Sequence, residues 1–254
     1  MVFLNAFDAG SAADAGYYRF GTTGTILGVA GGTLNYSYDS GSAANRSGVI
    51  KQFGNTTLEV GESLTFAFTI VNRTLRDDEN NSFRWSIGNI GTTVEADLAS
   101  AEPFSGGTRR NYVFAAATGS AATALNQHSA GFSSPVNGGT TTSLSGLDAS
   151  NFAASSDDAF SISVAFTRTA TGLDIEKDFG GVISSGSFAT STANDFVFNT
   201  IAFSFNNAGD YNISLDDISV SVIPEPKVYA ALAGFLALTF TVARRRRFRD
   251  SRKR

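Results

Sequence analysis

The chain has 254 residues, of which 42% are hydrophobic and only 17% are charged, and it contains one histidine and no cysteine. This composition can build a substantial core. It excludes disulfides, thiolate metal sites and any site that needs two imidazole groups. The charge is uneven, because residues 1–243 carry 11 basic and 22 acidic side chains whereas residues 244–254 carry 8 basic and one acidic. An acidic body is unsuited to nucleic acid, whose phosphates attract clustered lysine and arginine.

Residues 1–16 form an N-terminal segment without an export signal. Residues 1–8 lack both a basic start and an apolar run of the length that a secretory signal peptide needs. Because the C-terminal features described below indicate export, we expect the signal peptide to lie ahead of Met1.

Residues 17–222 alternate between apolar and polar side chains with a period of two, which is typical of half-buried strands. The expected strands are Thr25–Val29, Thr33–Tyr38, Val49–Phe53, Leu64–Ile70, Phe83–Ile90, Tyr112–Ala115, Ile162–Phe166, Leu173–Phe179, Phe196–Phe205 and Ile213–Val222. The alternation slips at Asn199–Thr200 and at Asp216–Asp217, which indicates two β-bulges. The sequence therefore predicts an all-β fold, an antiparallel two-sheet β-sandwich (jelly roll) over residues 17–222.

Two groups of side chains within this domain could bind a ligand. Asp77, Glu79 and Asn81 could offer oxygen ligands to a structural calcium ion, although the segment lacks the glycine and distal glutamate of an EF-hand loop. A polar hairpin turn explains the same residues. No other cofactor is expected, and His128, without acidic or histidine neighbours, is interpreted as a loop residue.

Aromatic side chains on the strands could stack on sugar rings. The candidates are Trp85, Tyr36, Tyr38 and Tyr112. Most aromatic residues on strands belong to the core, so this interpretation competes with simple burial.

Asp174, Glu176 and Asp178 alternate along one predicted strand, so their carboxylates should share one face. The segment resembles the Glu-x-Asp-x-x-Glu strand of laminarinase-like glycosidases, and retaining hydrolysis needs two carboxyl groups about 5–5.5 Å apart. The order of residues differs from that motif. A solvated outer face of the strand is the simpler interpretation, so we expect a protein that is not an enzyme.

The C-terminal part carries the most specific signal. Pro224-Glu225-Pro226 lies in a predicted hinge, residues 223–227, because two prolines can continue neither a strand nor a helix. Residues 228–243 contain no charge and are expected to form one transmembrane helix, somewhat short for a bilayer. The run Arg244, Arg245, Arg246 and Arg247 begins a basic tail, residues 244–254, which places the tail in the cytoplasm and the body outside.

In this order, the three features resemble the PEP-CTERM sorting signal of exported proteins of Gram-negative bacteria. The resemblance covers residues 223–247 and implies an exosortase-type processing protease as a partner. It also implies an intermediate anchored in the inner membrane, followed by delivery to the cell surface or extracellular matrix, often together with exopolysaccharide. The extra tail after Arg247 departs from the family, whose members usually end near the arginines.

Several phrases, among them Phe83-Arg-Trp-Ser-Ile-Gly88 and Leu215-Asp-Asp-Ile-Ser-Val220, resemble the concanavalin-like (laminin-G-like) jelly rolls of PEP-CTERM proteins. Our expectation is an exported structural or adhesive protein of the surface or matrix. The alternatives are a lectin-like module that binds exopolysaccharide and a laminarinase-like glycan hydrolase or lyase.

Overall fold

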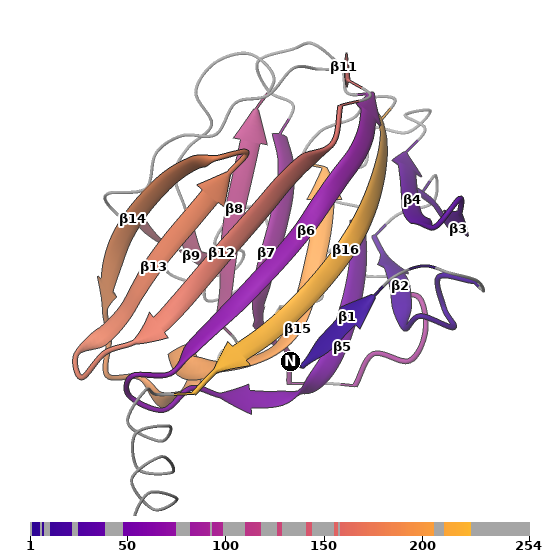
Figure 1. Ribbon diagram of the computed structural model, residues 1–254. Helices are drawn as coiled ribbons and strands as arrows, with labels where there is room; N and C mark the ends of the chain where they lie inside the picture. The colour runs from indigo at the N-terminus through magenta and orange to yellow at the C-terminus, as the bar shows by residue number, and fades with distance from the viewer. Residues whose placement is uncertain are drawn as a thin grey trace, which may run out of the picture.

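The computed structural model describes residues 2–5, 7, 11–21, 25–38, 48–74, 82–91, 93–98, 110–117, 126–128, 141–143, 155–156, 158–205 and 211–224. Within these residues the chain forms β-strands and one short 3-10 helix, η1 (Ala193–Phe196). The strands make two antiparallel sheets that pack face to face (Figure 1). The prediction of an all-β, two-sheet sandwich is confirmed.

Sheet A faces the viewer in Figure 1 and contains nine strands in the described part of the chain. Its main path runs through β14 (Val182–Ala189), β13 (Gly172–Phe179), β12 (Phe160–Arg168), β6 (Ser63–Thr74), β16 (Tyr211–Ile223), β4 (Thr33–Tyr38) and β3 (Thr25–Ala30). Two short strands join it beside this path, β1 (Phe3–Asn5) on β16 and β11 (Ser155–Ser156) on β6. The long strands β6 and β16 thus form the centre of the sheet.

Sheet B lies behind sheet A in Figure 1 and contains seven described strands. In spatial order these are β10 (Thr141–Ser143), β9 (Asn126–His128), β8 (Arg110–Ala117), β7 (Ser82–Asn89), β15 (Val197–Phe205), β5 (Gly48–Thr57) and β2 (Tyr17–Phe20). The interpretation of His128 as a loop residue was wrong, because it ends β9 and pairs with residues of both neighbouring strands.

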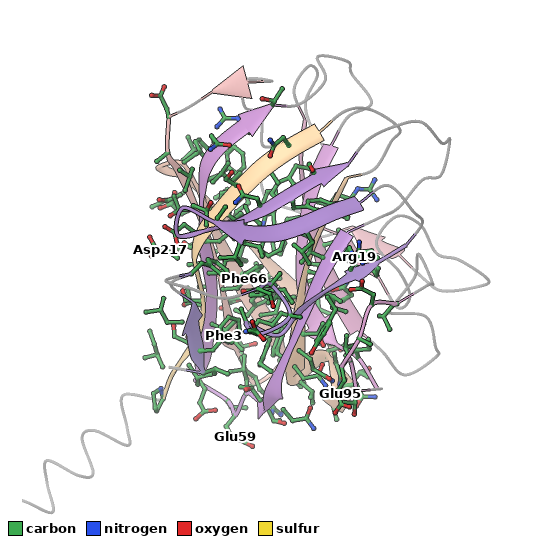
Figure 2. All side chains as sticks on the ribbon, turned by 90° about the vertical axis from the view of Figure 1, so that its right-hand side faces the viewer. Phe3, Arg19, Glu59, Phe66, Glu95 and Asp217 are labelled. Carbon is green, nitrogen blue, oxygen red and sulfur yellow. The ribbon has the colours of Figure 1, made fainter. Side chains whose placement is uncertain are left out.

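The core lies between the two sheets, where alternate side chains of each strand meet. Leu64, Phe66, Phe68 and Ile70 of β6 are all buried, and the three residues between them are partly exposed on the other face. Figure 2 shows Phe66 between the sheets, and its ring centroid lies 5.9 Å from that of Phe203 on β15. Because a shift of one residue would turn this whole set to solvent, the alternation fixes the register of the sheet.

Both predicted bulges are present. The pairing of β15 with β5 shifts between Phe198 and Thr200, and that of β16 with β6 shifts between Asp216 and Ser219. In the second bulge Asp217 has a φ of 51°, a left-handed conformation that is uncommon for a residue other than glycine. Each bulge resets the alternation, so that both halves of a long strand keep their apolar residues in the core.

The N-terminal segment is part of the sandwich. β1 pairs with Ile218–Val220 of β16, and Phe7 and Ala12 are buried in the main core. The ring of Phe3 lies 5.5 Å from that of Phe53. The sheet therefore also includes residues that precede the predicted start of the domain at residue 17.

Lys51 of β5 contacts this N-terminal segment. Its Nζ donates a hydrogen bond to the carbonyl oxygen of Ala15, and it lies 4.7 Å from the ring centroid of Tyr17 and 5.0 Å from that of Phe3. Partial burial lowers the pKa of Lys51 from its usual 10.5 to about 8. The folded protein thus releases this proton more easily than the unfolded chain does.

We expect Lys51→Met to have its largest stability advantage over the wild type near pH 7. Between pH 8 and 10.5 the unfolded wild-type chain holds a proton that the folded chain has released, so the free energy of unfolding of the wild type rises through this window. Over this pH window the free energy of unfolding of the wild type should rise by about 1 kcal/mol relative to that of Lys51→Met. This figure is reduced from the full pKa shift because the side chain is partly exposed. Urea unfolding of both proteins at pH 7, 9 and 10.5 measures it. A constant difference would contradict the lowered pKa.

Candidate functional site

The sequence-predicted carboxylates of β13 lie on the outer face of sheet A. Leu173 and Ile175 are buried against the core, so the strand's alternation turns Asp174 and Glu176 to the opposite, exposed face. Asp178 continues the row but is less exposed, and its Oδ1 accepts a hydrogen bond of 2.7 Å from the N–H of Gly181 in the following turn. The predicted solvated face of this strand is therefore confirmed.

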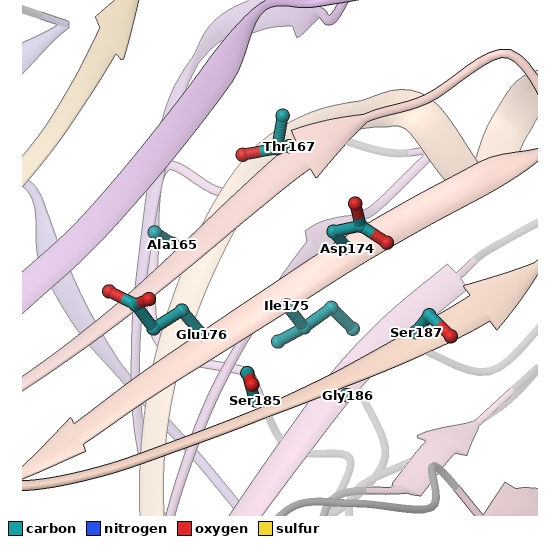
Figure 3. Close-up of a pocket in the computed structure, with 8 residues that line it drawn as sticks. All are labelled: Ala165, Thr167, Asp174, Ile175, Glu176, Ser185, Gly186 and Ser187. Atoms are coloured by element: carbon teal, nitrogen blue, oxygen red, sulfur yellow. The ribbon is translucent and has the colours of Figure 1, made fainter.

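The neighbouring strands enclose two of these carboxylates in a shallow depression. Asp174 pairs with Thr167 of β12 on one side and with Ser187 of β14 on the other. Glu176 occupies the equivalent place between Ala165 and Ser185. The depression has a volume of about 400 Å³ and opens to solvent, with both carboxylates projecting from β13 (Figure 3). Small hydroxyl-bearing side chains on both sides leave the carboxylates accessible.

A second depression of about 330 Å³ lies on the same face, toward the centre of sheet A. Ser163 and Asp178 line one side of it, and Ser219, Asp217 and the exposed Leu4 line the other. Figure 2 shows Asp217 on the outer side of this sheet. The outer face of sheet A is therefore hollowed at two places, and each hollow contains carboxylates and serine hydroxyls.

The charge on this part of the face is entirely negative. On the outward positions of β12, β13 and β14, all of them described, there is no basic side chain, because Lys177 points inward and is buried. Carboxylates act only as hydrogen-bond acceptors when ionised. The depression is therefore complementary to a ligand that offers many hydroxyl donors, and it repels anionic ligands.

The predicted role of the aromatic residues in sugar stacking is wrong for three of the four candidates. Trp85, Tyr36 and Tyr112 are each completely buried in the core between the sheets. The hydroxyl of Tyr112 donates to the carbonyl oxygen of Asp195 over 2.8 Å, which satisfies its polar group inside the fold. Tyr38 lies in β4, but its side chain is outside the described residues. Trp85, Tyr36 and Tyr112 are core because their strands alternate toward the opposite sheet.

The predicted calcium ligands Asp77, Glu79 and Asn81 lie outside the described residues. Among the residues that the structure does describe, no three acidic or histidine side chains are grouped so that they could hold a metal ion. The possible structural calcium site stays a prediction.

Of the predicted sorting motif, only Pro224 is described, and it directly follows the end of β16 at Ile223. Glu225, Pro226, the helix expected at residues 228–243 and Arg244–Arg247 lie outside the described residues. None of the helical structure that is described has the length and apolar character needed to cross a bilayer.

Sequence reasoning missed the side of the depression that β14 forms. This strand reads Val-Ile-Ser-Ser-Gly-Ser-Phe-Ala, whose polar residues do not alternate with a regular apolar set. The available signal was the pair Gly180-Gly181 between β13 and β14. Both glycines have positive φ values, 62° and 89°, as a tight hairpin turn requires.

The sequence matches no protein-family model, and no curated protein matches it. Among solved structures, the chain is similar to a protein of unknown function with a galectin-like fold from Bacillus subtilis, at 9% identity and a TM-score of 0.50, covering 88% of this chain and 97% of the other. It is also similar to an endo-1,3-β-glucanase from Streptomyces sioyaensis, at 12% identity and a TM-score of 0.50, covering 89% and 96%. At these identities the likeness establishes the jelly-roll fold alone.

Proposed function

We propose that this protein is an exported surface or matrix protein whose β-sandwich binds a neutral polysaccharide on the outer face of sheet A. The observation that carries this proposal is the depression formed by β12, β13 and β14, in which Asp174 and Glu176 stand among serine and threonine hydroxyls. Sugar hydroxyl groups donate hydrogen bonds to carboxylates, and they both donate to and accept from serine and threonine.

The charge of the chain supports a neutral rather than an acidic polysaccharide. Residues 1–243 carry twice as many acidic as basic side chains, and the depression itself carries two carboxylates. An anionic chain would meet like charges both at long range and in contact, which opposes binding. The expected ligand is therefore an uncharged exopolysaccharide.

Binding is a better interpretation than hydrolysis. A general acid that works near neutral pH needs a carboxyl group whose surroundings hold its proton, usually an apolar wall. Asp174 and Glu176 are both exposed, and the side chains that line their depression are small and mostly polar. The geometry supports an adhesive or lectin-like role, and glycan hydrolysis is not proposed.

The double variant Asp174→Asn/Glu176→Gln should bind a neutral exopolysaccharide at least about tenfold more weakly than the wild type, because two charge-assisted hydrogen bonds are lost. Its thermal midpoint should stay within a few degrees, since changes at exposed positions rarely exceed about 0.5 kcal/mol. The full chain in detergent is immobilised, and binding of a neutral β-glucan is compared with that of alginate. Glu95→Gln, which removes an exposed charge on another segment, is the matched control.

Two results would overturn this assignment. Equal binding of the neutral and the acidic polymer would contradict the electrostatic argument. Release of reducing ends from the β-glucan by the wild type, abolished in the double variant, would show that the depression is an active site instead.

The location of the protein is part of the same proposal. The order of Pro224-Glu225-Pro226, an uncharged stretch over residues 228–243 and Arg244–Arg247 supports a PEP-CTERM sorting signal. β16 ends at Ile223, one residue later than predicted, so the proposed hinge begins at the first proline, Pro224, and not at residue 223. Processing by an exosortase-type protease would then release the sandwich from the inner membrane to the cell surface or matrix.

A further inference from the structure

The second depression on the outer face of sheet A lies along a row of directly paired residues that crosses six strands. Each member of the row is the register partner of the next, so all their side chains lie on the same face. From β1 to β14 the row is formed by Leu4, Ser219, Ala67, Ser163, Asp178 and Ile183. Because neighbouring strands are about 4.8 Å apart, the row is about 24 Å long.

The row is low in the middle and raised at both ends. Its central members, Ser219, Ala67 and Ser163, have short side chains and line the second depression. Leu4 at one end and Ile183 at the other are 52% and 63% exposed. No member of the row is buried. The row therefore forms a shallow trough that is open to solvent and has an aliphatic side chain at each end.

Two carboxylates border the trough. The bulge in β16 turns the exposed side chain of Asp217 to the outer side of the sheet, where it lines the second depression (Figure 2). Its carboxylate has no hydrogen bond or ion pair with another described residue. Asp178, on the opposite side, uses Oδ1 for the N–H of Gly181 and keeps Oδ2 without a partner among the described residues. Both carboxylates can thus accept hydrogen bonds from a ligand.

The trough adjoins the depression that contains Asp174 and Glu176. Ser163 and Ala165 are two residues apart on β12, and each lines one of the two depressions. The same is true of Asp178 and Glu176 on β13. Residues two apart on a strand are separated by about 7 Å, and the residue between them on each of these strands is buried on the inner face. One extended ligand can therefore contact both depressions at once.

We propose that the trough and the Asp174–Glu176 depression together bind one linear chain of several neutral sugar units, which lies across the strands. This inference rests on the proposed function and names the form of its ligand. Leu4 contacts apolar C–H groups of one unit, while Asp178 and Asp217 accept hydrogen bonds from hydroxyl groups of others. Both depressions are too shallow to surround a small ligand, so the affinity comes from contacts that add along the chain.

The N-terminal segment is then part of the binding surface. Leu4 belongs to β1, which reaches the trough only by pairing with β16. β1 is short, and Leu4 is its one side chain that lines the second depression. The aliphatic end of the trough at β16 is therefore supplied by a strand far from the carboxylates of β13 in the sequence.

The dependence of affinity on ligand length tests this inference. The full chain in detergent is titrated by calorimetry with β-glucan oligosaccharides, from the disaccharide to the octasaccharide. The affinity of the wild type should rise about tenfold or more with length and level off once the oligosaccharide spans both depressions. The double variant Leu4→Ser/Asp217→Asn should bind the disaccharide as the wild type does, because the Asp174–Glu176 depression is unchanged, and should lose most of the gain with length.

The double variant should fold normally. Leu4 is half exposed, and asparagine is well tolerated in the left-handed conformation that Asp217 adopts, with its φ of 51°. The thermal midpoint should therefore stay within a few degrees of that of the wild type. Val60→Ser is the matched control, because Val60 is an aliphatic residue, 45% exposed, in a turn that lines neither depression. It should keep the length dependence of the wild type.

The possible failures are distinguishable. If the oligosaccharides bind with an affinity that does not change with length, or if the double variant keeps the full gain with length, the extended site is disproved while glycan binding at the Asp174–Glu176 depression stands. If no oligosaccharide and no β-glucan polymer binds, the proposed function is disproved, and this inference with it.

Discussion

Replacing Trp85 by alanine should remove about 3–5 kcal/mol from the free energy of unfolding. Trp85 of β7 is completely buried at the centre of the core. Its ring stacks on those of Phe83, Phe114 and Phe179, with centroids 5.8, 5.7 and 5.9 Å away, and meets Phe68 edge-on at 6.0 Å. The alanine variant would leave a cavity bordered by four aromatic rings from both sheets. Globular proteins typically have a free energy of unfolding of about 5–15 kcal/mol, so such a loss would leave the protein only marginally stable.

Urea unfolding followed by far-UV circular dichroism measures this effect. Tryptophan fluorescence cannot be used, because the variant lacks the chain's single tryptophan. Trp85→Phe is the control. It keeps an aromatic ring and removes an indole N–H that has no hydrogen-bond partner in the described residues, so it should lose much less stability. A Trp85→Ala protein that unfolds at the wild-type urea concentration but no longer binds polysaccharide would reverse the assignment of Trp85 to the core.

The fold was predictable because its strands are amphipathic. In β6 and β12 nearly every second residue is apolar and buried, so the pattern identified both strands and the face that each presents to the core. The two bulges were visible for the same reason, since a slip in the alternation must be absorbed by an extra residue. Six strands were missed: β1, β2, β9, β10 and β11 are too short to show a pattern, and the polar residues of β14 do not alternate with a regular apolar set.

The candidate site was only half predictable. Asp174 and Glu176 could be assigned to one exposed face from their spacing alone. Their neighbours could not, because Thr167 and Ser187 reach them through strand pairing, which the spacing of residues along one strand does not reveal. The aromatic candidates failed for a different reason. Aromatic side chains suit both a sugar-binding surface and a core, and Trp85, Tyr36 and Tyr112 all lie on the inner face.

Replacing Pro224-Glu225-Pro226 by three alanines should abolish C-terminal processing and leave the protein at its full length in the membrane fraction. The two prolines hold the backbone of the proposed hinge extended, so that an outward-facing protease can reach it without breaking a strand. Alanine restores the backbone N–H groups and permits helix, which would continue the predicted membrane helix toward β16. The substitution changes no residue of the apolar stretch, so insertion into the membrane should persist.

Fractionation and mass spectrometry of the mature C-terminus test this in cells that contain the processing enzyme. The wild type should be shorter by about 3 kDa, the mass of the 28 residues after Pro226 in a chain of 254 residues and 26.6 kDa. Neutral replacements of Arg244–Arg247 form the matched control for the anchor. Each charge that crosses the bilayer centre costs roughly 2.5–3.5 kcal/mol, so the four arginines hold the tail on the cytoplasmic side. Without them, the protein should be retained less well in the membrane and should be oriented less uniformly, while the hinge stays intact. Arg249, Arg252, Lys253 and Arg254 should compensate in part. A wild-type protein that still carries Arg254 at the cell surface would disprove the sorting signal and leave a permanent tail anchor.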